Sequence, residues 1–303
     1  MLVAAFARKQ YLSSSVDFEQ HGPVTFPQSF PLYLHYVRFK REKKPVEFRF
    51  VDYLSVLSAV QRLQPNVIMV HGDEEPTGKY WNLSKENHRV QFRKIQSVKQ
   101  TGWLDNAPRD IHVLEHRADI AKLDALLQYG GVAADFDVYF LRGQRLRQLI
   151  RAGRFITCYG NKEGYNMGLL AGPATSKILW AWRRSYTDIY TPDWNFNSGF
   201  VPKFLSYLYP QEAYVLNNTC NNPHPFRLYP FFHEPDAIRW ENSMAIHAYN
   251  RFSYDPIESP EDLVNGNLTS YREILLTIWE NRTLPPVDAG YNDEIQLVRD
   301  FEP

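Results

Sequence analysis

The chain has 303 residues, of which 34 are basic and 34 are acidic, so its formal net charge at pH 7 is zero. This balance argues against electrostatic binding to nucleic acid or to an anionic membrane. Hydrophobic residues at 44% and aromatic residues at 15% supply a substantial core and exclude a wholly disordered chain. The length fits one large α/β domain or two smaller ones.

Residues 1–27 show no sustained hydrophobic period, so we expect a tail or stem. No apolar run has the length of a membrane helix, and Arg8 and Lys9 end the apolar start too early for a secretory signal. The two cysteines, Cys158 and Cys220, allow one disulfide in an oxidising lumen or two free buried thiols. Four N-x-S/T sequons are compatible with a lumenal protein, at Asn82, Asn217, Asn267 and Asn281.

Strand and helix patterns alternate after residue 30. Residues 30–39 are rich in aromatic and β-branched side chains, which predicts a strand. Apolar side chains recur on one face of residues 50–63, which predicts a helix, and residues 67–70 form a short apolar strand before a polar loop. This order is typical of a mostly parallel, Rossmann-like α/β sheet with helices on both faces.

Weaker patterns fill the rest of the chain. We expect residues 82–109 to be largely irregular, with one short helix around 90–100. The other expected elements are strands at 111–114, 155–159, 166–171 and 244–249, helices at 143–152, 176–190 and 270–280, and an extended loop at 219–235.

The central segment is residues 116–141, which read HRADIAKLDALLQYGGVAADFDVYFL. Ile120 and Leu123 follow the helical period. Gly130 and Gly131 end this helix, because glycine enters the left-handed conformation without a Cβ penalty. A short apolar run after the two glycines then predicts a buried strand.

Two acids, Asp135 and Asp137, interrupt that apolar run. They are two residues apart, so on a regular strand their side chains share one face. Two carboxylates in such a place repel each other and lose hydration unless a cation compensates them. Oxygen ligands suit Mg²⁺ or Mn²⁺, so we expect a metal site here, with a solvent-facing acid pair as the alternative.

The pattern H-R-A-D-I-x-K-x-x-x-L-x-x-Y-G-G-V-x-x-D-x-D resembles the D-x-D region of GT-A glycosyltransferases. The group it resembles contains Golgi alpha-1,4-galactosyltransferases, alpha-1,4-N-acetylglucosaminyltransferases and fungal initiating alpha-1,6-mannosyltransferases. The resemblance covers residues 30–250 and implies a GT-A fold for residues 28–250. Residues 251–303 would form a C-terminal helical extension packed on this domain.

The resemblance also implies contacts to a nucleotide-sugar. Asp119 would meet the ribose or the donor sugar, with Arg117 and Lys122 beside it, and Asn166 would lie near the donor. The family usually has arginine where this chain has Lys122, and lysine lacks the bidentate fork of arginine. A surface pair between Asp119 and Lys122 is the alternative interpretation.

Two histidines are candidates by the same resemblance. Residues 244–249 are similar to a late A-x-H-x-W strand of the family, with tyrosine in place of tryptophan, and His247 would complete the metal shell. His35 in the first strand is a weaker candidate on the nucleotide side. A buried structural histidine is the alternative at both positions.

Aromatic-rich loops offer further sugar contacts. Trp81 follows a strand end and is a candidate for stacking on a base or sugar. Trp194, Asn197 and Ser198 suit a donor or acceptor sugar, since aromatic faces pack on sugar C–H groups and amides bond hydroxyls. A partly buried surface tryptophan is the alternative for Trp81, and loop packing is the alternative for the other three residues.

We therefore expect a metal-dependent, retaining hexosyltransferase that uses a UDP-sugar, or in second place GDP-mannose, and a glycan, glycolipid or glycoprotein acceptor. Mn²⁺ or Mg²⁺ is the expected cofactor. The resemblance implies the Golgi lumen if a membrane anchor is missing from this sequence, and otherwise the cytoplasm. Two alternatives remain, a catalytically degenerate sugar-binding relative and a D-x-D phosphohydrolase. Such phosphohydrolases usually have threonine or valine two residues after the second aspartate, where this chain has Tyr139.

Overall fold

The computed structural model describes residues 31–41, 45–104, 107–161, 164–216, 220, 223, 227–253 and 256–291. The expected tail at 1–27 and the sequon at Asn217 lie outside these ranges. Within them, no helix is both long and apolar enough to cross a membrane.

The described residues form a seven-stranded central sheet with the order β10-β8-β9-β6-β1-β2-β3. Strand β9 runs antiparallel to both of its neighbours, and the other neighbouring strands pair in parallel. The mostly parallel sheet expected from the sequence is thus confirmed. The strands are β1 (Tyr33–Val37), β2 (Val67–Gly72), β3 (Gln91–Lys94), β6 (Gly131–Ala134), β8 (Phe155–Asn161), β9 (Gly164–Gly172) and β10 (Ala213–Leu216).

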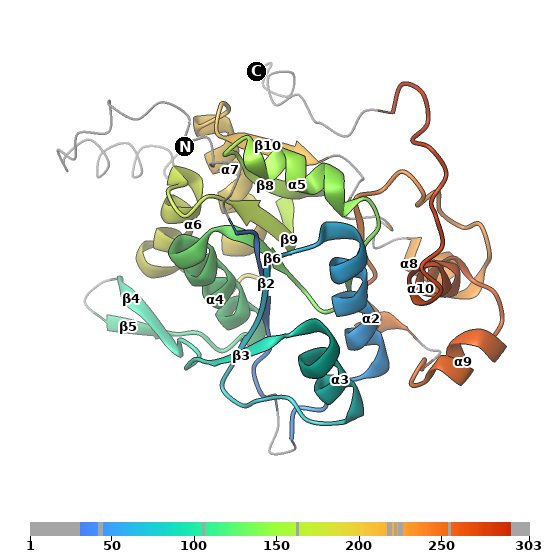
Figure 1. Ribbon diagram of the computed structural model, residues 1–303. Helices are drawn as coiled ribbons and strands as arrows, with labels where there is room; N and C mark the ends of the chain where they lie inside the picture. Colours follow the sequence, from blue (N-terminus) through green and yellow to red (C-terminus); the bar gives the residue numbers. More distant parts are fainter. Residues whose placement is uncertain are drawn as a thin grey trace.

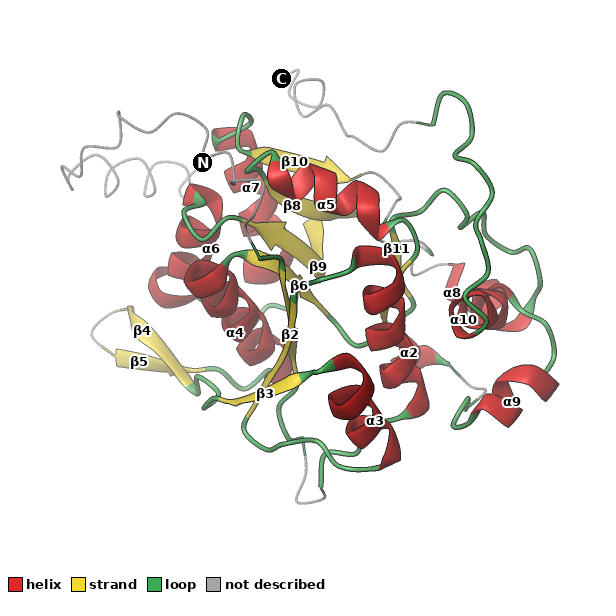
Figure 2. Cartoon of the chain, viewed as in Figure 1, coloured by secondary structure: helices red, strands yellow, loops and turns green. Residues whose placement is uncertain are grey.

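Helices cover both faces of the sheet, as predicted (Figures 1 and 2). The alternation of strand side chains explains the two layers, because Val132 and Ala134 of β6 join one core and Ala133 joins the other. The first core includes α2 (Phe50–Ser58), α3 (Lys79–His88) and α5 (Gly143–Arg151), and the second includes α4 (Leu114–Tyr129), α6 (Lys177–Asp188) and α7 (Val201–Leu208).

The sequence prediction was wrong mainly between residues 82 and 114. This stretch holds the end of α3, strand β3, and an antiparallel hairpin of β4 (Gln100–Leu104) and β5 (Ala107–Asp110), instead of a helix around 90–100. Residues 111–113 belong to no strand. Helix α3 buries only Trp81 and Ser84, so its sequence lacks the apolar period that reveals a helix.

Smaller corrections concern two other segments. The helix predicted at 50–63 ends as α2 at Ser58 and continues as a π-helical turn, η1 (Ala59–Leu63). The loop predicted at 219–235 contains a short helix, α8 (Leu228–His233). A second π-helical turn, η2 (Phe196–Phe200), precedes α7.

A two-stranded sheet joins the chain's late segments to its centre. Strand β7 (Val138–Phe140) pairs antiparallel with β11 (Ala245–His247), which is followed by a 3-10 turn, η4 (Asn250–Phe252). Helices α9 (Pro260–Asn265) and α10 (Ser270–Trp279) follow, and α10 buries Ile274, Leu275 and Ile278 in the same core as α2.

The two cysteines form a disulfide between Cys158 on β8 and Cys220, with a Cα–Cα distance of 5.8 Å. The structure thereby selects one of the two states that the sequence left open.

Candidate active site

A cavity of about 860 Å³ opens at the carboxyl ends of β1 and β6. Its wall includes Val37 at the end of β1, Asp135 and Asp137 after β6, and Met167 and Gly168 in the middle of antiparallel β9. Parallel strands end at a common edge, and ligands of open α/β sheets bind at that edge. The fold therefore places the acid pair where a ligand is expected.

Asp135 and Asp137 lie in a turn between β6 and β7, which corrects the expectation of one regular strand. The N–H of Val138 donates to the Asp135 carbonyl at 3.0 Å and closes this turn. Phe136 between the acids packs on the Tyr36 ring at 4.4 Å and under the Arg38 guanidinium at 4.4 Å. Because this middle side chain is anchored, the turn holds both carboxylates at the cavity.

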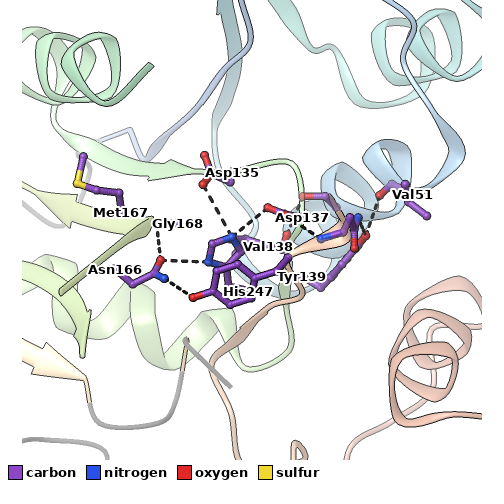
Figure 3. A network of polar contacts seen from close by, with 12 residues as sticks. Val51, Asp135, Asp137, Val138, Tyr139, Asn166, Met167, Gly168 and His247 are labelled. Atoms are coloured by element: carbon purple, nitrogen blue, oxygen red, sulfur yellow. Dashed lines mark hydrogen bonds and ion pairs between the residues drawn. The ribbon is translucent and has the colours of Figure 1, made fainter. Parts of the chain in front are cut away.

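His247 joins the two acids, as Figure 3 shows. Pairing of β11 with β7 sets His247 opposite Val138, and its Nε2 lies 3.2 Å from Asp137 Oδ1 and 3.9 Å from Asp135 Oδ2. One ligand atom from each of the three residues lies within 4.8 Å of the others. The three predicted metal ligands therefore converge, although about 110 positions separate His247 from the acids in the chain.

The hydrogen bonds of Asn166 determine the proton position on His247. Asn166 Oδ1 accepts the Gly168 N–H at 2.5 Å and lies 3.1 Å from His247 Nδ1. A backbone N–H only donates, so this atom is the amide oxygen and His247 Nδ1 carries a hydrogen. His247 Nε2 therefore faces the two carboxylates, and its lone pair would share a cation such as Mn²⁺ with them.

The imidazole fits only because residue 168 is glycine. A Cβ on Gly168 would lie 2.6 Å from His247 Cε1 and 2.7 Å from Asn166 Oδ1. The imidazole also stacks with the Tyr249 ring at a centroid distance of 4.0 Å. Asn166 Nδ2 donates to the Tyr249 hydroxyl at 2.6 Å, so one amide orients both rings.

The two oxygens of Asp135 have separate partners. Lys122 Nζ lies 2.6 Å from Asp135 Oδ1, which leaves Oδ2 toward His247. The Lys122 ammonium also donates to the Met167 carbonyl at 3.0 Å. Burial opposes its charge, but Asp135 and Asp119 outweigh burial and hold the pKa of Lys122 above its ordinary value. Lys122 is buried and does not line the cavity, so it contacts Asp135 from inside the protein.

Asp119 lines the cavity, but it is not half of a surface pair. Its carboxylate is 3.6 Å from Lys122 Nζ and accepts a bond from the Tyr186 hydroxyl at 3.3 Å. Burial raises the pKa of Asp119 to about 7, which Lys122 opposes and Asp135 reinforces. Asp137 differs, because burial would raise its pKa, yet His247 and the Asn250 N–H hold it below the ordinary value.

Other predicted donor residues divide into two groups. Asn166 and Ser198 line the cavity together with the half-exposed Trp194. Their contacts to a donor or acceptor stay predictions. Arg117 does not line the cavity, because its Nε donates to the Ile111 carbonyl at 2.7 Å.

Trp81 and Asn197 do not line the cavity, and their side chains are bonded inside the protein. Trp81 is 1% exposed, packs on Phe48 and donates to Glu75, so no ring face is open to a base. Asn197 is fully buried, and its side chain bonds the Ser185 carbonyl and the Thr191 N–H. Both expectations are corrected, because burial removes these side chains from the site.

His35 is a buried structural histidine, which was the alternative for that residue. Its Nε2 bonds the Gly130 carbonyl at 3.0 Å, and its Nδ1 faces His71 Nε2 at 3.1 Å. Burial lowers the pKa of His35 and of His71 to about 4, so both rings stay neutral near pH 7.

Several cavity residues were not predicted from the sequence. Arg38 bonds Asp52 in a bidentate pair at 2.8 and 2.9 Å, and Asn250 donates its backbone N–H to Asp137 at 3.0 Å. No local pattern marks such residues, because their partners are distant in the sequence. The other basic side chains in the described cavity wall are Lys40, Arg41, Arg49 and Arg251.

Sequence comparison identifies the family that this site resembles. Residues 60–155 match the family described as glycosyltransferase sugar-binding region containing DXD motif. This match confirms the predicted glycosyltransferase resemblance. Over 178 residues the chain is 28% identical to Glucan organizing enzyme 1 of Cryptococcus neoformans var. grubii serotype A, covering 56% of this chain and 47% of that protein. The chain thus spans about half the length of the curated relative it matches.

Solved glycosyltransferase structures are also similar to this chain. The glycosyltransferase GlyE of Streptococcus pneumoniae TIGR4 aligns with a TM-score of 0.43 and 10% identity over 82% of this chain and 60% of that one. The galactosyltransferase LgtC, in complex with donor and acceptor sugar analogs, aligns with a TM-score of 0.40 and 13% identity over 84% and 98%. Mouse xyloside xylosyltransferase 1 aligns with a TM-score of 0.39 and 12% identity over 75% and 99%.

Proposed function

We propose that this chain is a metal-dependent, retaining glycosyltransferase that moves a hexose from a nucleotide-sugar to a hydroxyl acceptor. The observation that carries the proposal is the convergence of Asp135, Asp137 and His247 on a cavity at the carboxyl edge of the sheet. The two acids lie within the residues that match the DXD family. A cavity of about 860 Å³ has the size of a small-molecule ligand site.

The chain's own residues would divide the work as follows. Asp135 Oδ2, Asp137 Oδ1 and His247 Nε2 would hold Mn²⁺ or Mg²⁺, with Lys122 orienting Asp135 through its other carboxylate oxygen. The bound ion would stabilise the charge that develops on the departing diphosphate. Polar groups on the cavity wall, among them Asn166 and Ser198, would orient sugar hydroxyls.

A UDP-sugar is the proposed donor, with GDP-mannose second, and a glycan, glycolipid or glycoprotein hydroxyl is the proposed acceptor. Both proposals, like retention of the anomeric configuration, rest on the resemblance of the residue 116–137 pattern.

Hydrolysis of a panel of nucleotide-sugars by the purified chain tests the function. We expect release of a nucleoside diphosphate from at least one donor with Mn²⁺, and none with a chelator. Release of inorganic phosphate from phosphate esters would instead support a phosphohydrolase. Binding of a donor without turnover, in the presence of glycan acceptors, would support a degenerate sugar-binding relative.

We also propose that the protein works in the lumen of the secretory pathway. The Cys158–Cys220 disulfide supports an oxidising compartment, and three sequon asparagines, Asn82, Asn267 and Asn281, are exposed. A mobility shift after glycosidase treatment of protein from eukaryotic cells is expected. Unmodified protein with two free thiols would contradict this location.

A further inference from the structure

The Asp137 carboxylate receives support from a segment that the sequence did not mark. While Asp137 Oδ1 faces His247, Asp137 Oδ2 accepts the backbone N–H of Asn250 at 3.0 Å. The Ala248 N–H donates to the Asp137 carbonyl at 2.8 Å, so residues 248–250 bond Asp137 twice. The orientation of Asp137 therefore depends on where this late segment is held.

Two tyrosine hydroxyls hold the Asn250 side chain. Asn250 Nδ2 donates to the Tyr139 hydroxyl at 2.8 Å, and the Tyr271 hydroxyl donates to Asn250 Oδ1 at 2.8 Å. The two hydroxyls are 3.2 Å apart, and both tyrosines are buried. Tyr139 comes from β7 beside the acid turn, and Tyr271 comes from α10 near the chain's end.

Packing alone does not require these hydroxyls. The Tyr271 ring packs on Phe231 and Phe232, an environment that phenylalanine would fill equally well. Buried hydroxyls cost free energy unless they are bonded. Among the residues that the structure describes, these two hydroxyls bond Asn250, each other and the Val51 carbonyl. The two tyrosine hydroxyls in this apolar region therefore act mainly to hold the side-chain amide of Asn250 in place.

We propose that Asn250 is a positioning residue, clamped by Tyr139 and Tyr271, that fixes Asp137 for cation binding and makes α10 part of the active site. The inference rests on the proposed function, since it assigns a role within the same metal site. Partners behind a metal ligand typically change metal affinity tenfold or more when they are removed.

Calorimetric titration with Mn²⁺ in the presence of UDP tests the clamp. Tyr271→Phe keeps the packing and removes one bond to Asn250, and Asn250→Ala removes both side-chain bonds. We expect the Mn²⁺ dissociation constant to rise about tenfold in Asn250→Ala and less in Tyr271→Phe. The double variant should bind like Asn250→Ala, because both changes act through one amide.

Tyr53→Phe is the matched control, because it also removes a hydroxyl bond of a buried tyrosine, to His88, away from the cavity. It should bind Mn²⁺ like the parent. The clamp would be overturned if both test variants melted at a lower temperature but kept the Mn²⁺ dissociation constant of the parent. That outcome would leave the proposed function intact. A parent that binds no Mn²⁺ would overturn the proposed function and the clamp together.

Discussion

At the residue scale, the site depends on close contacts between small and large side chains. The His247 imidazole lies close to Gly168 and stacks with the Tyr249 ring. Asn166 fixes its tautomer through the Gly168 N–H. The sequence predicted His247 and Asn166 by resemblance, but it did not predict that Gly168 must be a glycine. A sequence motif does not show which backbone atoms a side chain will contact in the fold.

Substituting Gly168 by alanine should therefore displace the His247 imidazole. We expect Gly168→Ala to weaken Mn²⁺ binding at least tenfold, as for other losses of ligand orientation, with a smaller effect on folding. Calorimetry with Mn²⁺ and UDP, together with a thermal melt, measures both quantities.

The control for this change lies on the same strand. A Cβ on Gly172 would meet only the Leu179 side chain at 3.1 Å and the Phe155 Cα at 3.6 Å. Gly172→Ala should bind Mn²⁺ like the parent. Equal Mn²⁺ affinity in Gly168→Ala and the parent would show that His247 is not a ligand.

At the element scale, strong hydrophobic periods were predicted correctly and polar elements were not. The helix that became α4 and the short strand β6 followed directly from the residue 116–134 pattern. Helix α3 and the β4–β5 hairpin were not predicted, because their stability comes from tertiary contacts, as with the buried Trp81. The turn that carries Asp135 and Asp137 between β6 and β7 was not predicted either. Phe136 is apolar and looks like part of a strand in the sequence, but in the structure it packs on Tyr36 and anchors the turn.

Strands β1 and β2 carry a pH response through their buried histidines. His35 and His71 have pKa values near 4 when folded and near 6.5 when unfolded, so the unfolded chain binds protons first as the pH falls. The free energy of unfolding should then drop between pH 6.5 and 4, by up to about 1.4 kcal/mol per pH unit for each histidine.

Denaturant unfolding at a series of pH values measures this slope. In His71→Gln one of the two titrating groups is gone, and the slope contributed by the pair should fall by about half. The same slope in both proteins would mean that other groups cause the acid sensitivity.

At the scale of the whole molecule, the fold brings distant segments to one sheet edge. The mostly parallel sheet could be predicted from the sequence. The pairing of β11 with β7 was compatible with the sequence but could not be predicted from it. No sequence pattern indicated the contact between Asn250 and Tyr271. The disulfide was likewise open until the structure brought the two cysteines together. Long-range contacts of this kind are fixed by the folded chain as a whole, which one sequence does not display.

The disulfide should contribute to global stability, because it closes a loop between residues 62 positions apart. Its reduction should lower the free energy of unfolding by about 2–4 kcal/mol. Denaturant titration with and without dithiothreitol measures the loss, and a variant with Cys158→Ser and Cys220→Ser should not respond to the reductant. An unresponsive parent protein would contradict the Cys158–Cys220 disulfide.

The central claim is that Asp135, Asp137 and His247 hold a divalent cation on which nucleotide binding depends. The most direct test is calorimetry of UDP binding, with and without Mn²⁺, on the parent and on Asp137→Asn. We predict Mn²⁺-dependent binding by the parent and its loss in Asp137→Asn, with the far-ultraviolet circular dichroism spectrum unchanged. Unchanged Mn²⁺-dependent affinity in a correctly folded Asp137→Asn would contradict the claim.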